Sequence, residues 1–305
     1  MPVITTSEQC FIKQLNKLNK LYEKNKRPDV LRLYRSDART PLFMLESLCR
    51  IYRKIYPAST FDAQLTYYKK LEDAFGVMDY YEVLAREASN SAAKKRFLIE
   101  RNKAEQGLKA LYIQNKKNTG PLRLLEFRKA LGRVEWKKNE KEAALIRKFI
   151  KKQFVKIKKG IKSGKLHFRD MESGVHEIRR KLRWISIYSQ SLNGLIEVKP
   201  SHEKHARFKK YKTKNVLNSP FNVLPVNKEW KTKIFFDADH FFALSWIIAE
   251  LGLIKDAGLT MHATNKVLGK SKTVAQQKEE IELLEKARTI TLQFIKDFDT
   301  DKFLS

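Results

Sequence analysis

Hydrophobic residues recur at the spacing of an α-helix over most of the chain. Near the start, Phe11, Leu15 and Leu18 lie three or four residues apart, and the run Thr-Ser-Glu-Gln that begins at Thr6 is typical of a helix-capping box. In the first half, helices are predicted over residues 6–28 and 37–56 and from residue 59 onward, where breaks are expected near 90–91 and 118–121. No series of alternating residues predicts strands.

The second half shows the same periodicity. Ile146, Ile150 and Phe154 mark one face of a helix predicted over residues 143–161, and lysines mark another face. Further helices are predicted over residues 173–188, 239–257 and 274–298. Residues 199–230 contain three prolines and few periodic positions, so this segment is predicted to be a long, mostly irregular connection.

This pattern, with only 11 Gly and 8 Pro in 305 residues, predicts an all-α protein. A weak internal repeat relates the two halves. The segment around Arg39 parallels the segment around Arg179, and Ala74-Phe-Gly76 parallels Glu250-Leu-Gly252. Two similar helical bundles account for this repeat, although amphipathic helices also resemble one another by chance.

The chain is strongly basic. It contains 63 Lys and Arg residues and 34 Asp and Glu residues, which gives a formal net charge of +29. Residues 137–214 alone hold 24 basic and 7 acidic side chains. A polyanionic partner is therefore expected. Two Cys residues without a CxxC pair fit a reducing compartment, and the longest apolar run has nine residues, too few for a membrane span. No signal peptide is expected, and the predicted location is cytoplasmic.

The most cationic face belongs to the helix predicted over residues 173–188. It carries four side chains at positions i, i+3, i+4 and i+7: His176, Arg179, Arg180 and Arg183. The apolar stripe of this helix lies about 100° round its axis, so the helix can pack and still present these side chains. Guanidinium groups bind phosphate oxygens in a bidentate manner. A solvated charged face is the simpler alternative.

The segment from His176 to Trp184 resembles the signature of the conserved histidine α-helical domain (CHAD) family, His-x-x-Arg followed by Lys or Arg and an aromatic residue. Leu251-Gly252 with Asp256 resembles the Leu-Gly-x-x-x-Asp turn of that family, and Phe75-Gly76 begins a degenerate counterpart in the first half. The resemblance implies two antiparallel four-helix bundles related by a pseudo-twofold, a basic central cleft or pore, and binding of inorganic polyphosphate.

Under this resemblance, residues 1–138 form the N-terminal half and residues 139–305 the C-terminal half of one CHAD-like domain. The first half departs from the motif, because Ser36 occupies the histidine position and Glu46 occupies a basic one. In the second half, Ser186 stands where family members often carry another arginine. We therefore expect the binding site to depend mainly on the second half.

The sequence thus predicts a non-catalytic protein that binds polyphosphate, with no cofactor and no metal, and with an association with polyphosphate granules. Besides the four residues of the cationic face, the expected contacts come from the lysine-rich helix, the basic connection and, more weakly, the first half: Lys148, Lys151, Lys152, Lys156, Lys159, Lys204, Arg207, Lys209, Lys210, Arg35, Arg39 and Arg50.

Two other functions compete. The same cations attract a nucleic-acid backbone, and Phe208 and Tyr211 place aromatic rings within a basic stretch, as stacking on bases would require. A phosphohydrolase is suggested by Asp237 and Asp239, but these residues are more simply caps of the following helix. The pair His202 and His205 lacks further ligands for a metal.

Overall fold

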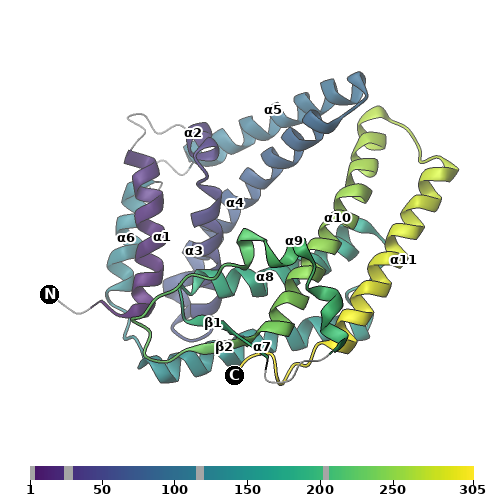
Figure 1. Cartoon of the computed structure of the whole chain (residues 1–305). Helices are drawn as coiled ribbons and strands as arrows, with labels where there is room; N and C mark the ends of the chain where they lie inside the picture. The colour runs from purple at the N-terminus through teal and green to yellow at the C-terminus, as the bar shows by residue number, and fades with distance from the viewer. Residues whose placement is uncertain (1–3, 24–29, 115–119, 202–205) are drawn as a thin grey trace. The chain divides into compact units, whose positions relative to one another are not determined.

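The computed structural model describes residues 4–23, 30–114, 120–201 and 206–305 (Figure 1). The chain divides into two compact units, unit 1 with residues 1–137 and unit 2 with residues 138–305. Both units are built mainly from helices, which confirms the all-α fold class. None of the described helices combines the length and apolarity needed to cross a membrane.

Unit 1 consists of helices α1 (Thr6–Glu23), α2 (Val30–Arg35), α3 (Arg39–Tyr52), α4 (Ala58–Glu87), α5 (Ser91–Gln114) and α6 (Pro121–Leu131). Helix α3 packs between α1 and α4, α5 packs along α4, and α6 packs against α1. Aromatic rings fill the core, with Phe11 in contact with Tyr52, Phe61 and Phe127 at centroid distances of 5.1, 5.8 and 5.7 Å.

The start of α1 differs by one residue from the prediction. The hydroxyl Oγ1 of Thr5 accepts a hydrogen bond from the backbone N–H of Glu8 at 3.2 Å, so Thr5, and not Thr6, caps the helix. Consecutive threonines make both cap positions compatible with the sequence. The predicted end of this helix near Pro28 lies outside the described residues.

Unit 2 contains four long helices: α7 (Asn139–Lys162), α8 (Glu177–Ser191), α10 (Ala238–Leu268) and α11 (Val274–Asp297). The shorter elements are the π-turn η1 (Met171–His176), strand β1 (Ile196–Lys199), η2 (Ala206–Tyr211), α9 (Lys214–Leu217), η3 (Pro220–Asn222) and strand β2 (Ile234–Asp237). Helix α8 packs between α7 and α10, and α11 packs along α10.

Two short strands were not predicted. β1 and β2 pair in parallel, with Ile196 opposite Ile234. The last residues of the chain extend this pairing, because the N–H of Phe235 donates to the carbonyl of Ser305 at 2.9 Å and the N–H of Ser305 donates back at 3.0 Å. Four-residue strands are too short to show an alternating pattern, so the expectation of no strands was wrong for this segment.

The two units show the same succession of packed helix pairs. In unit 1 the pairs are α1 with α3, α3 with α4 and α4 with α5; in unit 2 they are α7 with α8, α8 with α10 and α10 with α11. This order agrees with the internal repeat in the sequence. The pseudo-twofold arrangement of two four-helix bundles stays a prediction.

Candidate anion-binding site

The cationic face of α8 begins at an irregular turn. Before α8, the carboxylate of Asp170 accepts hydrogen bonds from the N–H groups of Ser173, at 2.6 Å, and Gly174, at 3.3 Å. These bonds fix the start of η1, whose last residue is His176. Because Ile178 and Leu182 are fully buried, the opposite side of α8 turns outward. The predicted helix and its orientation in unit 2 thus agree with the periodicity.

Arg179 lies across the neighbouring helix α10. Its Nε donates to the backbone carbonyl of Ile248 at 3.1 Å. A Cβ atom on Gly252 would lie 3.0 Å from the same Nε, so the glycine gives the guanidinium room. Burial lowers the pKa of Arg179, and the charge of Asp256 opposes this change. Within the described chain, no carboxylate forms an ion pair with Arg179.

His176 is half-buried, and its Nδ1 is enclosed without a hydrogen-bond partner among the described residues. Burial lowers the pKa of His176, which favours the neutral imidazole. Glu172 acts in the opposite direction, whereas Lys255, Arg179 and Arg180 lower the pKa further. Three neighbouring cations therefore oppose protonation of this imidazole in unit 2.

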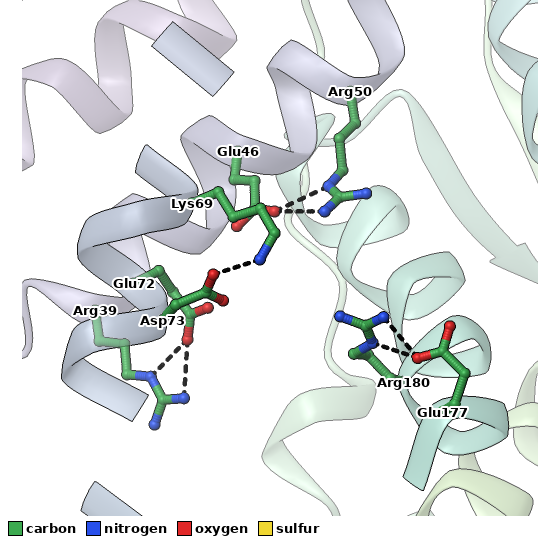
Figure 2. A network of polar contacts seen from close by, with 8 residues as sticks. All are labelled: Arg39, Glu46, Arg50, Lys69, Glu72, Asp73, Glu177 and Arg180. Atoms are coloured by element: carbon green, nitrogen blue, oxygen red, sulfur yellow. Dashed lines mark hydrogen bonds and ion pairs between the residues drawn. The ribbon is translucent and has the colours of Figure 1, made fainter. Parts of the chain in front are cut away.

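Arg180 has a carboxylate partner on its own helix, so it is less available to an external anion than its position in the motif suggests. Its Nη2 lies 2.6 Å from Glu177 Oε2 (Figure 2). Lys181 Nζ lies 3.0 Å from Glu177 Oε1. These hydrogen bonds and charges lower the pKa of Glu177, although burial alone raises it. These two ion pairs were not predicted, although Glu177 precedes Arg180 and Lys181 at the i, i+3 and i, i+4 spacings that favour such pairs on a helix. Arg183 is exposed on the same face.

The lysines of α7 divide into two groups. Lys148, Lys152, Lys156 and Lys159 are exposed. The ring of Phe149 contacts that of Tyr188 in α8, with the ring centroids 5.3 Å apart. Lys152 and Lys156 follow Phe149 at helical spacing, so these two lysines lie along the edge of α7 next to α8. Lys151 instead donates to the carbonyl of Asp301 at 2.9 Å.

Several side chains of the basic connection have partners within unit 2 or are buried. Lys210 Nζ lies 2.7 Å from Asp297 Oδ2, which also accepts a hydrogen bond from the Tyr211 hydroxyl at 2.7 Å. Phe208 and Tyr211 are both 1% exposed, so the idea that these rings are available for stacking on bases was wrong. Arg207 and Lys209 are exposed, and Lys204 lies outside the described residues.

In unit 1 the predicted arginines are occupied by carboxylates of the same unit. Arg39 Nε donates to Glu72 Oε1 at 2.8 Å, and Arg39 also pairs with Asp79. Arg50 Nη2 lies 2.6 Å from Glu46 Oε1 (Figure 2). Arg39 and Arg50 are thus both engaged in ion pairs within unit 1, and their expected contribution to ligand binding stays a prediction.

The remaining cation of that set, Arg35, is exposed at the end of α2. Tyr34, the residue before it, donates its hydroxyl to Asp79 at 2.6 Å and to Glu82 at 2.7 Å. Acidic side chains of α4 thus surround the unit 1 counterpart of the cationic face.

The two aspartates considered for phosphate transfer have structural partners. Asp237 caps α10, accepting hydrogen bonds from the His240 N–H at 3.1 Å and from His240 Nδ1 at 2.6 Å. Burial raises its pKa, but the hydrogen bonds from His240 and Ser201 outweigh this and hold it at about 2. Asp239 lies 2.5 Å from Lys212 Nζ. Within the described ranges, no group of three or more His, Cys, Asp or Glu side chains could hold a metal ion.

Comparison of the chain with known protein families, curated proteins and solved structures finds no match. The resemblance to the CHAD family therefore rests on the motif residues around His176 and Gly252 and on the degenerate counterpart at Phe75-Gly76.

Proposed function

We propose that this protein binds inorganic polyphosphate, without catalysing a reaction, on the outward face of α8. The observation that carries the proposal is the environment of Arg179. Its guanidinium is positioned by Gly252 and by the carbonyl of Ile248, and no described carboxylate forms an ion pair with it, although the charge of Asp256 acts on it. A positioned guanidinium without an ion pair suits a phosphate oxygen, because charge-assisted hydrogen bonds to phosphate are about twice as strong as neutral ones.

A chain of phosphates suits this surface better than a single anion. His176 and Arg183 extend the face along α8, and Lys152 and Lys156 of α7 lie along its edge. A linear polyanion can contact all of these groups at once and release counterions from each contact. The resemblance of the His176 motif to the CHAD signature supports the same ligand.

Nucleic acid is the competing ligand, because its backbone carries the same charge. Burial of Phe208 and Tyr211 removes the aromatic groups that favoured it. Long-chain polyphosphate and single-stranded and duplex oligonucleotides, matched in phosphate number, should be titrated over a salt series. We expect polyphosphate to bind more tightly at physiological salt. Equal affinities that fall together with salt would make nucleic acid the leading ligand.

The face itself is tested by charge reversal. The variant Arg179→Glu/Arg180→Glu/Arg183→Glu should lose polyphosphate affinity by about 100-fold or more. A matched control with the same change in net charge reverses three exposed cations of α11: Lys278→Glu, Lys286→Glu and Arg288→Glu. Helix content by circular dichroism should be unchanged in both variants. Equal losses of affinity in the two variants would exclude α8 as the specific site.

A further inference from the structure

The connection between α9 and β2 presents apolar side chains to solvent. Phe221 and Val223 are each 75% exposed, Val226 is 79% exposed, and Leu217, at the end of α9, is 50% exposed. Four such side chains within ten residues differ from the scattered single hydrophobic residues of an ordinary surface. We refer to residues 217–226 as the apolar connection.

The exposure of these side chains is fixed by the backbone. Within the segment, Gln190 of α8 donates its amide Nε2 to the carbonyl of Phe221 at 2.5 Å. Just after its end, Lys233 Nζ donates to the carbonyl of Asn227 at 2.5 Å. The apolar connection is therefore held by unit 2 at two points while its apolar side chains point away from the core.

Cations flank the apolar connection on both sides along the chain. Residues 206–233 contain eight Lys and Arg residues and one acidic residue, Glu229. Lys214, Lys228 and Lys231 are exposed and form no ion pair with a carboxylate in the part of the chain that the structure describes. Exposed apolar side chains between exposed lysines are the combination that binds an anionic lipid surface, where the apolar groups enter the interface and the lysines contact headgroups.

We propose that the apolar connection docks the protein onto an anionic lipid surface. Phe221, Val223 and Val226 enter the boundary between headgroups and acyl chains, and Lys214 and Lys228 contact the headgroup phosphates. A protein partner fits less well, because lysine is depleted at protein–protein interfaces. Nucleic acid fits less well, because Phe221 is the single aromatic ring among the four exposed apolar side chains, and the leucine and valines offer no surface on which further bases can stack. This docking is independent of polyphosphate binding on α8.

The test uses the full-length protein and sedimentation with vesicles of phosphatidylcholine alone or of an equimolar mixture of phosphatidylcholine and phosphatidylglycerol. The wild-type protein should bind the anionic vesicles and leave the neutral ones unbound at the same lipid concentration. The variant Phe221→Ser/Val223→Ser/Val226→Ser should lose at least about tenfold in affinity for the anionic vesicles. Its matched control replaces three exposed apolar residues of α10 and α11: Leu253→Ser, Val274→Ser and Ile281→Ser.

A second readout separates insertion from charge attraction at the α8 face. The variant Phe221→Trp should shift its fluorescence emission to shorter wavelength on the anionic vesicles, because the indole leaves water. Both serine variants should keep wild-type affinity for polyphosphate, which separates this proposal from the proposed function. The proposal is overturned if wild-type protein ignores the anionic vesicles, if both serine variants bind them equally, or if the emission of the Phe221→Trp variant does not move.

Discussion

Units 1 and 2 each place an arginine against a glycine of their longest helix. They differ in the groups that accept hydrogen bonds from this arginine. In unit 1, a Cβ on Gly76 would lie 2.8 Å from Nη2 of Arg39; in unit 2, a Cβ on Gly252 would lie 3.2 Å from Nη2 of Arg179. The arrangement is the same, and only glycine gives the guanidinium this much room at either position.

The difference lies at two positions of the long helix. Four residues before the glycine, unit 1 has Glu72, which pairs with its arginine, whereas unit 2 has Ile248, which offers a backbone carbonyl. Three residues after the glycine, unit 1 has Asp79 and unit 2 has Lys255. The same local structure therefore holds an arginine paired with two carboxylates in unit 1 and, among the described residues, an arginine without an ion pair in unit 2.

The largest expected effect separates stability from binding. Arg39→Leu should lower the free energy of unfolding by about 3 kcal/mol, because the buried Glu72 loses its ion pair. Arg179→Leu should cost only about 1 kcal/mol, because a carbonyl loses one hydrogen bond, but it should weaken polyphosphate binding by about tenfold. Urea unfolding and ligand titration of both variants measure the two effects. Loss of affinity in Arg39→Leu alone would contradict the comparison.

An intermediate effect is expected from removing the carboxylates of unit 1. In the double variant Glu72→Gln/Asp79→Asn, Arg39 keeps hydrogen-bond acceptors but loses its neutralising charges. Calorimetric titration with a short polyphosphate should then show a second, weaker binding event.

The matched control Glu279→Gln/Glu282→Gln makes the same charge change on the exposed face of α11 and should bind as the wild type does. A second event in both double variants would mean that net charge alone produces it. If neither double variant shows a second binding event, unit 1 has no latent polyphosphate-binding site.

The smallest effect concerns pH. Because burial lowers the pKa of folded His176 below its ordinary value of 6.5, the unfolded chain takes up the proton first as the pH falls. Stability should therefore fall below about pH 6.5, and His176→Gln should remove that part of the slope. Bound polyphosphate favours the imidazolium, so its affinity should rise over the same range.

Local periodicity accounts for what the sequence could predict. The apolar faces of α7 and α8 follow from residues three and four apart, and Ile146, Ile150, Ile178 and Leu182 are all buried as expected. The end of α10 was placed at Ala257, the residue before Gly258, but the helix continues to Leu268. Gly258 allows Met171 to approach, since a Cβ there would lie 2.5 Å from Met171 Cγ.

The charge state of the candidate site depends on tertiary contacts that periodicity does not contain. Arg39 meets Glu72 and Asp79 from another helix, 33 and 40 residues further along the chain. Lys210 forms an ion pair with Asp297, which lies at the end of α11. The sequence identified the cationic side chains, but which of them are neutralised follows only from how the helices pack.

The strand pairing in unit 2 also has a consequence for the order of folding during synthesis. Phe303 and Leu304 are buried, and β2 pairs on one side with β1 and on the other with residues 303–305. Unit 2 therefore cannot complete its core until residues 303–305 have left the ribosome. Unit 1 draws its core from residues 1–137, so its helices can assemble while the cationic face of α8 is still incomplete.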